Sequence, residues 1–155
     1  MNNLNNILKE ATKNNYAIGH FNISNLEQLK AIVLASTSME TETPIMIGVS
    51  EGERKFIGLK QCVYLIKSFR EELGIPIFIN SDHSHSTETA KASFDVGFDS
   101  VHIDLSKFPY KENLKGTKEV VDYIKSKNQL NQELNRNPPA KIKRINSKWG
   151  YYKRG

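Results

Sequence analysis

Short apolar runs alternate along the chain with longer segments in which apolar residues recur at helical spacing. The short runs predict strands, and the longer segments predict helices, because apolar residues at i, i+3, i+4 and i+7 share one helix face. Strands are predicted over residues 16–22, 45–50, 77–81 and 100–104, and helices over residues 4–14, 26–36, 58–73, 87–96 and 112–127. This order of one helix and four strand–helix units predicts an α/β fold with parallel strands buried on both faces.

The pattern weakens after Asn128. Residues 129–135 (QLNQELN) predict a fifth, polar strand, and the residues beyond them contain two adjacent prolines and few apolar side chains. We therefore expect an α/β body over residues 1–127 and a basic, irregular, disordered tail over residues 128–155.

The length of 155 residues suits one domain. Hydrophobic residues make up 38% and charged residues 25%, which excludes a collagen-like or wholly disordered chain. No apolar run reaches the roughly 18 residues of a membrane span, and the first residues do not form a secretory signal. Because Cys62 is the only cysteine, it has no partner for an internal disulfide, and we expect a cytoplasmic protein.

The positive net charge is concentrated in the predicted tail. Residues 128–155 contain seven lysines and arginines but a single acidic residue, Glu133, whereas residues 1–127 carry a net charge of −1. Since the folded part is close to neutral, the overall charge of +5 does not indicate a nucleic-acid-binding surface.

Polar or ionisable side chains stand at the ends of all four predicted strands. Asn22 ends the first strand, Ser50 ends the second, Asp82 and His83 follow the third, and Asp104 ends the fourth. Because parallel strands bring their carboxyl ends to one edge, we expect these side chains to gather there. Asn22 and Ser50 could equally be ordinary turn residues, because Asn and Ser are common in turns. Asp82 and His83 point more strongly to a functional site, because an adjacent carboxylate and imidazole offer a proton acceptor and a metal ligand together.

The other histidines allow more than one interpretation. His85 lies two residues from His83, so the two could share a metal in an extended segment, but we favour an exposed loop residue. His20 and His102 lie within strands and are predicted to be packed histidines with hydrogen-bond partners.

Several stretches resemble the N-terminal half of the class II, zinc-dependent fructose-bisphosphate aldolases and related ketose-bisphosphate aldolases. The similarity runs from about residue 4 to residue 127, and its most specific parts are Asp82-His83, VGFDSVHIDLS (96–106) and ENLKGTKEVV (112–121). The resemblance implies the N-terminal half of a TIM (β/α)8 barrel, with four to five parallel strands after a short N-terminal helix.

The resemblance also implies one catalytic acid/base, two substrate-binding residues and three metal-binding residues. These are Asp82 for proton transfer, Asn22 and Ser50 for the substrate, and His83, Asp104 and Glu133 for metal. Glu133 matches the family only in part, because the glycine that follows in the family pattern is replaced here by Asn135.

The implied activity is that of a lyase with a zinc cofactor. Such an enzyme reversibly cleaves a phosphorylated ketose to dihydroxyacetone phosphate and an aldehyde phosphate. A complete barrel needs at least about 200 residues, and in the family its later strands bring two more zinc-binding histidines and the phosphate-binding loops. The last histidine here is His102, so we expect an inactive fragment, produced by truncation or by a frameshift near residue 128.

Two other interpretations stay open. A half barrel has open strand edges, so the chain is alternatively a non-catalytic assembly module that pairs with another chain and forms a homo-oligomer. A chain of this length can also close an independent doubly wound α/β sheet, which strand order would reveal. We expect neither a membrane nor a nucleic-acid partner.

Overall fold

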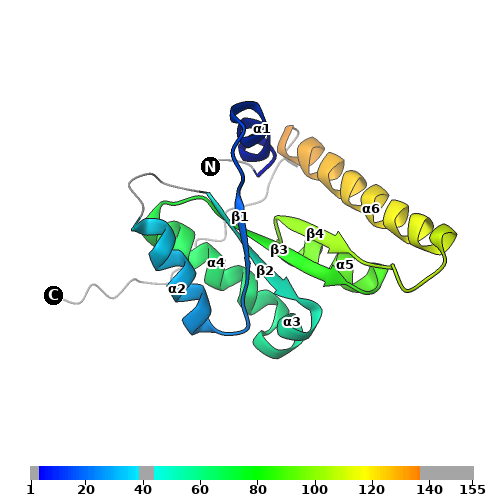
Figure 1. Ribbon diagram of the computed structural model, residues 1–155. Coiled ribbons are helices and arrows are strands. Elements are labelled where there is room, and N and C mark those ends of the chain that lie inside the picture. The colour runs from blue at the N-terminus through cyan, green and yellow to red at the C-terminus, as the bar shows by residue number, and fades with distance from the viewer. Residues whose placement is uncertain (1–3, 39–43, 137–155) are drawn as a thin grey trace, which may run out of the picture.

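The chain folds as a helix followed by strand–helix units, in the order expected from the hydrophobic pattern (Figure 1). The computed structural model describes residues 4–38 and 44–136, with side chains to residue 128. The elements are α1 (Leu4–Asn14), β1 (Gly19–Asn22), α2 (Leu26–Thr37), β2 (Ile45–Ser50), α3 (Glu51–Ile57), α4 (Leu59–Leu73), β3 (Ile77–Ser84), α5 (Thr87–Val96), β4 (Ser100–Ile103) and α6 (Tyr110–Arg136).

The four strands form one parallel sheet in the order β1-β2-β3-β4. Gly19 pairs with Ile45, which pairs in turn with Ile77, so the first three strands begin level with one another. This sequential order is that of a barrel segment, whereas a doubly wound sheet reverses its order at a switch point. The expectation of a half barrel is therefore confirmed, and the doubly wound alternative is excluded.

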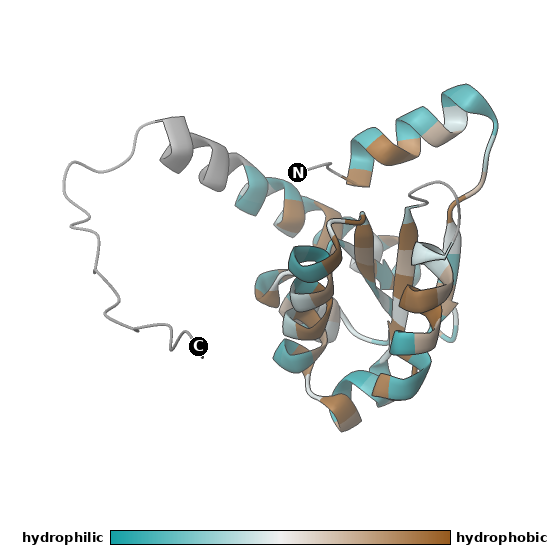
Figure 2. Ribbon diagram, turned by 90° about the vertical axis from the view of Figure 1, so that its left-hand side faces the viewer, coloured by the Kyte–Doolittle hydropathy of each residue, from teal (hydrophilic) through white to brown (hydrophobic). Residues whose placement is uncertain are grey.

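The hydrophobic core lies between one face of the sheet and the helices that follow the strands. Figure 2 shows apolar residues concentrated along the strands and on the inward sides of the helices. The buried cluster consists of Ile23, Leu29, Val33, Ile45, Ile47, Val49, Cys62, Val63, Ile66, Ile75, Ile77, Ile79 and Phe98. Cys62 belongs to this core, and burial raises the pKa of its thiol to about 11, so the thiol stays protonated near neutral pH.

The opposite face of the sheet is polar near the carboxyl ends of the strands. Alternate residues point to one face of a strand, so His20 and Asn22 of β1 share this face with Asn80 and Asp82 of β3. Asn80 is 7% exposed and therefore buried, whereas His20 and Asn22 are exposed. In a closed barrel this face would line the interior.

Residues 51–57 form a helix, α3, that the apolar pattern did not predict. Ser50 caps this helix, because its Oγ accepts a hydrogen bond of 3.3 Å from the backbone N–H of Glu53. Gly58, with φ of 101°, separates α3 from α4. The signal was present as Ser-x-x-Glu, the sequence of a capping box, but only a short apolar pattern follows it.

The last helix is longer than the sequence predicted. Helix α6 continues to Arg136, so the expected fifth strand over residues 129–135 is wrong, and the expected boundary after residue 127 lies inside this helix. Gln, Leu and Glu favour helix, and no β-branched residue occurs in this segment. The rest of the predicted tail, residues 137–155, lies outside the described residues. Within the described ranges, no helix is long and apolar enough to cross a membrane.

Candidate active site at the carboxyl ends of the strands

Asn22 and Asp82 meet across the sheet, although β2 lies between their strands. The Nδ2 of Asn22 donates a hydrogen bond of 2.6 Å to Oδ2 of Asp82. Gly48 of β2 makes this approach possible, because a Cβ at this position would lie 2.7 Å from two ring atoms of His20 and closer still to Oδ1 of Asn22. The absence of a side chain at Gly48 therefore lets a residue of the first strand hold a residue of the third.

The carboxyl group of Asp82 is held in its charged form. Burial opposes ionisation, but the hydrogen bond from Asn22, together with the nearby charges of His83 and His20, lowers the pKa of Asp82 below its usual value. With Oδ2 bound to Asn22, Oδ1 faces the two histidines described below. Asp82 is therefore ionised at neutral pH and has an oxygen with which to accept a proton.

His83 is oriented by Asp104 at the end of the neighbouring strand. Its Nδ1 lies 2.8 Å from Oδ2 of Asp104, and Oδ1 of Asp104 accepts a hydrogen bond from the backbone N–H of Ser106. Hydrogen bonds from Ser106 and His83 hold the pKa of Asp104 well below its usual range. An ionised Asp104 favours a proton on Nδ1 of His83, which leaves Nε2 as the nitrogen that can bind a metal.

The register between β3 and β4 shifts at this point. Ser81 pairs with Val101 and Ser84 with Ile103, so Asp82 and His83 together stand opposite the single residue His102. His83 has a φ of 44°, in the left-handed region that only a few non-glycine residues adopt. The shift thus turns two consecutive side chains of β3 toward one side chain of β4.

His102 is therefore part of the site. Its Nδ1 lies 3.6 Å from Oδ1 of Asp82, and its ring centroid lies 4.3 Å from that of His83. Its side chain is 47% exposed, so the prediction of a packed structural histidine is wrong for His102. His20 is also exposed, so it is not packed either, but it has the predicted hydrogen-bond partner, since its Nε2 lies 3.3 Å from Nδ2 of Asn80.

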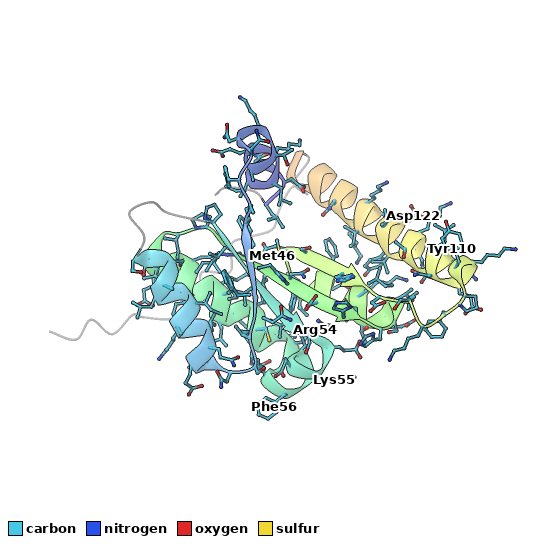
Figure 3. The ribbon with its side chains drawn as sticks, viewed as in Figure 1. Met46, Arg54, Lys55, Phe56, Tyr110 and Asp122 are labelled. Atoms are coloured by element: carbon cyan, nitrogen blue, oxygen red, sulfur yellow. The ribbon has the colours of Figure 1, made fainter. Side chains whose placement is uncertain are left out.

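Arg54 of α3 supports the backbone beneath the site (Figure 3). Arg54 is 3% exposed, and its guanidinium donates to the carbonyl oxygens of Val49 (2.5 Å) and Asp82 (3.0 Å) and to Oγ of Ser84 (3.0 Å). These bonds join the ends of β2 and β3. Arg54 thereby fixes the strand end from which Asp82 and His83 project.

Two of the other predicted site residues have different surroundings. Ser50 is the register partner of Asp82, but its hydroxyl caps α3. Glu133 lies on α6 rather than on a strand, and its side chain is outside the described residues. The substrate role of Ser50 and the metal role of Glu133 therefore stay predictions. His85 is exposed, as favoured, and its backbone N–H bonds to Glu51.

The donor set at this edge suits a zinc-type ion. One ligand atom each from Asp82, His83 and His102 lie within 4.8 Å of one another, and no other such group of three occurs among the described residues. Imidazole nitrogens and carboxylate oxygens are common protein ligands of zinc. The hydrogen bond between His83 and Asp104 is also the arrangement that orients many metal-binding histidines.

Comparison with known proteins agrees with the resemblance in the sequence. The family described as "Fructose-bisphosphate aldolase class-II" matches residues 2–133. The chain is 42% identical over 120 residues to the fructose-bisphosphate aldolase of Geobacillus stearothermophilus, covering 76% of this chain and 41% of that protein. It is 40% identical over 124 residues to the Staphylococcus aureus (strain Mu50) aldolase, covering 78% of this chain and 43% of the relative.

Solved structures show the same relationship. The YdjI aldolase from Escherichia coli K12 matches with a TM-score of 0.66 and 29% identity, over 76% of this chain and 44% of that chain. A putative fructose-1,6-bisphosphate aldolase from Coccidioides immitis matches with a TM-score of 0.65 and 28% identity, over 76% of this chain and 46% of that chain. The chain thus spans less than half the length of these relatives. With its match over residues 2–133, it belongs to the class II fructose-bisphosphate aldolase family.

Proposed function

We propose that this chain contributes the N-terminal half of a class II aldolase active site, which reversibly cleaves a carbon–carbon bond of a phosphorylated ketose. The observation that carries the proposal is the position of Asp82. Asn22 holds Oδ2 of its carboxylate, while Oδ1 lies beside His83 at the carboxyl edge of the sheet, where barrel enzymes place their chemistry.

Asp82 is the proton-transfer group in this proposal. As an ionised carboxylate, it accepts the proton of the substrate hydroxyl beside the breaking bond, and it returns that proton in the direction of synthesis. Asn22 keeps the carboxylate in one orientation throughout. General acid–base catalysis of this kind contributes about 10²–10⁴-fold to a rate.

His83 is the zinc-binding residue of this half. Asp104 orients its ring, so that Nε2 is directed toward Oδ1 of Asp82 at 3.8 Å. A zinc ion, when bound, supplies a Lewis acid that polarises the ketose carbonyl. Further ligands and the phosphate-binding groups are proposed to come from barrel strands outside the matched 41–46% of the relatives.

Cleavage therefore requires this half barrel to be combined with the remaining strands. Positioning of a substrate supplies as much as about 7–11 kcal/mol of barrier lowering, and a half site without the phosphate-binding loops cannot supply it. The test is cleavage of fructose 1,6-bisphosphate with added zinc by the purified chain, first alone and then mixed with the separately produced C-terminal half of the Geobacillus stearothermophilus relative. We expect background rates alone and activity in the mixture that Asp82→Ala abolishes. Activity of the chain alone that Asp82→Ala abolishes would show that the half barrel completes its own site.

A second function, assembly with another copy of the chain, is favoured by an apolar groove beside the open edge of β1. The groove has a volume of about 430 Å³ and is lined by Gly19, Phe21, Ala31, Ile32, Ala35, Ser36 and Ile45. Closing a barrel requires a strand to pair with β1 and a helix to cover this groove. Light scattering after size exclusion tests this function: a defined dimer that Phe21→Lys dissociates supports it, and a monomer or a broad aggregate opposes it.

A further inference from the structure

His102 lies beside Asp82 and His83, a contact that the sequence did not predict, and this group of side chains suggests a further role for the site. The resemblance assigns only His83, Asp104 and Glu133 to metal, and it leaves His102 without a role. The register shift nevertheless places His102 against both Asp82 and His83. Among the described residues, these three side chains are the one group that brings three potential metal donors together.

The separations of the donor atoms are close to those that a metal needs. Oδ1 of Asp82 lies 3.8 Å from Nε2 of His83 and 3.6 Å from Nδ1 of His102. Two donors that bind one zinc ion tetrahedrally at 2.0–2.1 Å are about 3.4 Å apart. Both separations from Asp82 are within a few tenths of an ångström of this value, whereas the ligand atoms of His83 and His102, which lie within 4.8 Å of each other, have to approach by up to about 1.4 Å to share one ion.

Two of the three side chains are already fixed by contacts that leave the donor atom available. Asn22 occupies Oδ2 of Asp82, so Oδ1 is the oxygen on the histidine side. Asp104 occupies Nδ1 of His83, so Nε2 is the nitrogen on the aspartate side. Because neither side chain has to be reoriented, the loss of conformational entropy on binding is small.

We propose that Asp82, His83 and His102 form a divalent-metal site of the zinc type that is contained within this half barrel. The side chains of His83 and His102 are about half exposed, which leaves the ion accessible and a fourth position open to water. This site differs from the metal set that the family resemblance implies, and it does not rest on the proposed aldolase activity.

The site has a consequence for Asp82. Metal binding would use Oδ1, the same oxygen that the proposed aldolase function uses to accept a proton. The two uses of Asp82 therefore exclude one another. A half barrel loaded with metal in this way holds its ion but has no proton acceptor at this position.

The sequence offers a rival pair of ligands, His83 and His85, which are two residues apart. The structure favours His102, because His85 follows the end of β3 and does not belong to the donor group. Because His85 and His102 are both exposed, substitution of each by the same residue gives a matched comparison.

The experiment measures metal binding by the whole purified chain after treatment with a chelator, with no substrate present. Zn²⁺ binding is followed by titration calorimetry and Co²⁺ binding by its visible absorption. We expect one ion per chain, at least 10-fold weaker binding in His102→Gln and His83→Gln, and less than two-fold change in His85→Gln. Asp104→Asn is expected to weaken binding less than His83→Gln does, because it removes the orienting hydrogen bond but no ligand.

Circular dichroism spectra and urea midpoints of each variant show whether it is still folded, so that weaker metal binding can be assigned to the lost ligand rather than to unfolding. A folded His102→Gln variant that binds Zn²⁺ as the parent chain does would overturn the proposal. The absence of Zn²⁺ binding by the parent chain would also overturn it, as would equal weakening by His85→Gln and His102→Gln. The aldolase proposal is unaffected by these outcomes, because it is tested by activity in the presence of the other barrel half.

Discussion

The Nδ2 of Asn22 donates a hydrogen bond of 2.6 Å to Oδ2 of Asp82, although the two residues are 60 positions apart in the sequence. This bond crosses the sheet above Gly48, and it is one of the interactions that lower the pKa of Asp82. It therefore links the packing of the first three strands to the charge of the proposed proton acceptor.

The Asn22→Ala substitution is expected to raise the pKa of Asp82, because it removes a hydrogen bond to the charged form. The measurement is a titration of the Asp82 carboxyl carbon by NMR. Asn25→Ala is the matched control, since Asn25 caps α2 by accepting a hydrogen bond from Gln28. The control should lose about 1 kcal/mol of stability without moving the Asp82 titration. An unchanged Asp82 titration in Asn22→Ala would contradict the assigned role of the bond.

The Gly48→Ala substitution is expected to displace His20 and Asn22, because the new Cβ would lie 2.7 Å from the ring of His20. We expect a loss of about 1–3 kcal/mol in the free energy of unfolding, typical of overpacking, and a raised pKa of Asp82. Urea denaturation and the same NMR titration provide the two readouts. Gly52→Ala is the control, since the nearest atom to its Cβ would be 4.0 Å away. Equal changes in stability and in the Asp82 titration for Gly48→Ala and Gly52→Ala would contradict the role assigned to the close approach at Gly48.

The Arg54→Met substitution is expected to destabilise the chain by about 3 kcal/mol or more. It would remove this donor from the buried carbonyl oxygen of Val49, from the partly buried carbonyl oxygen of Asp82 and from the hydroxyl of Ser84, which keeps its bond to Ser81. Each buried polar group left unsatisfied costs about 1–3 kcal/mol. The neighbouring Lys55 has a side chain that is 73% exposed, so Lys55→Met should change stability by no more than about 0.5 kcal/mol. Urea midpoints compare the two variants, and a cost for Arg54→Met as small as that for Lys55→Met would refute this role of Arg54.

The Glu51→Gln substitution is expected to lower stability at neutral pH and to make it less sensitive to acid. A hydrogen bond from the backbone of His85, followed by the interaction with Lys55, lowers the pKa of Glu51 from 4.5 to about 2. Since the folded form binds the proton more weakly than the unfolded form, this stabilisation is present above about pH 4.5 and is lost as the pH falls toward about 2. The stability difference between the parent and Glu51→Gln should therefore shrink over this interval. Urea midpoints measured down to about pH 3 check this, and a constant difference would contradict it.

The succession of the four strands and most helices along the chain could be predicted, because apolar periodicity is a local property of the sequence, whereas the order of the strands within the sheet had to come from the structure. The carboxyl-edge positions of Asn22, Asp82 and Asp104 followed from the same pattern and from the geometry of parallel sheets. Helix α3 was missed because it is short, and the end of α6 was missed because its polar residues carry little periodicity.

The contacts of His102 and Arg54 could not be predicted from local pattern. His102 reaches Asp82 only because the register between β3 and β4 shifts after Ser81, and register depends on the pairing of two distant segments. The charged residues around Arg54 in the sequence are typical of an exposed segment. Arg54 is nevertheless buried, because three hydrogen-bond acceptors from the ends of two strands surround its guanidinium. Both features arise from tertiary structure.

The central claim is that this half barrel carries a competent Asp82 half site, and a chimaeric enzyme tests it most directly. Residues 1–127 of this chain are joined to the part of the Geobacillus stearothermophilus relative that follows the aligned region. The cleavage of fructose 1,6-bisphosphate is then measured with zinc present. We predict activity in the chimaera, a loss of about 10²–10⁴-fold in kcat/KM for Asp82→Ala, and an unchanged rate for the control His85→Gln. A folded, zinc-loaded chimaera that is inactive, or whose rate Asp82→Ala leaves unchanged, would contradict the account.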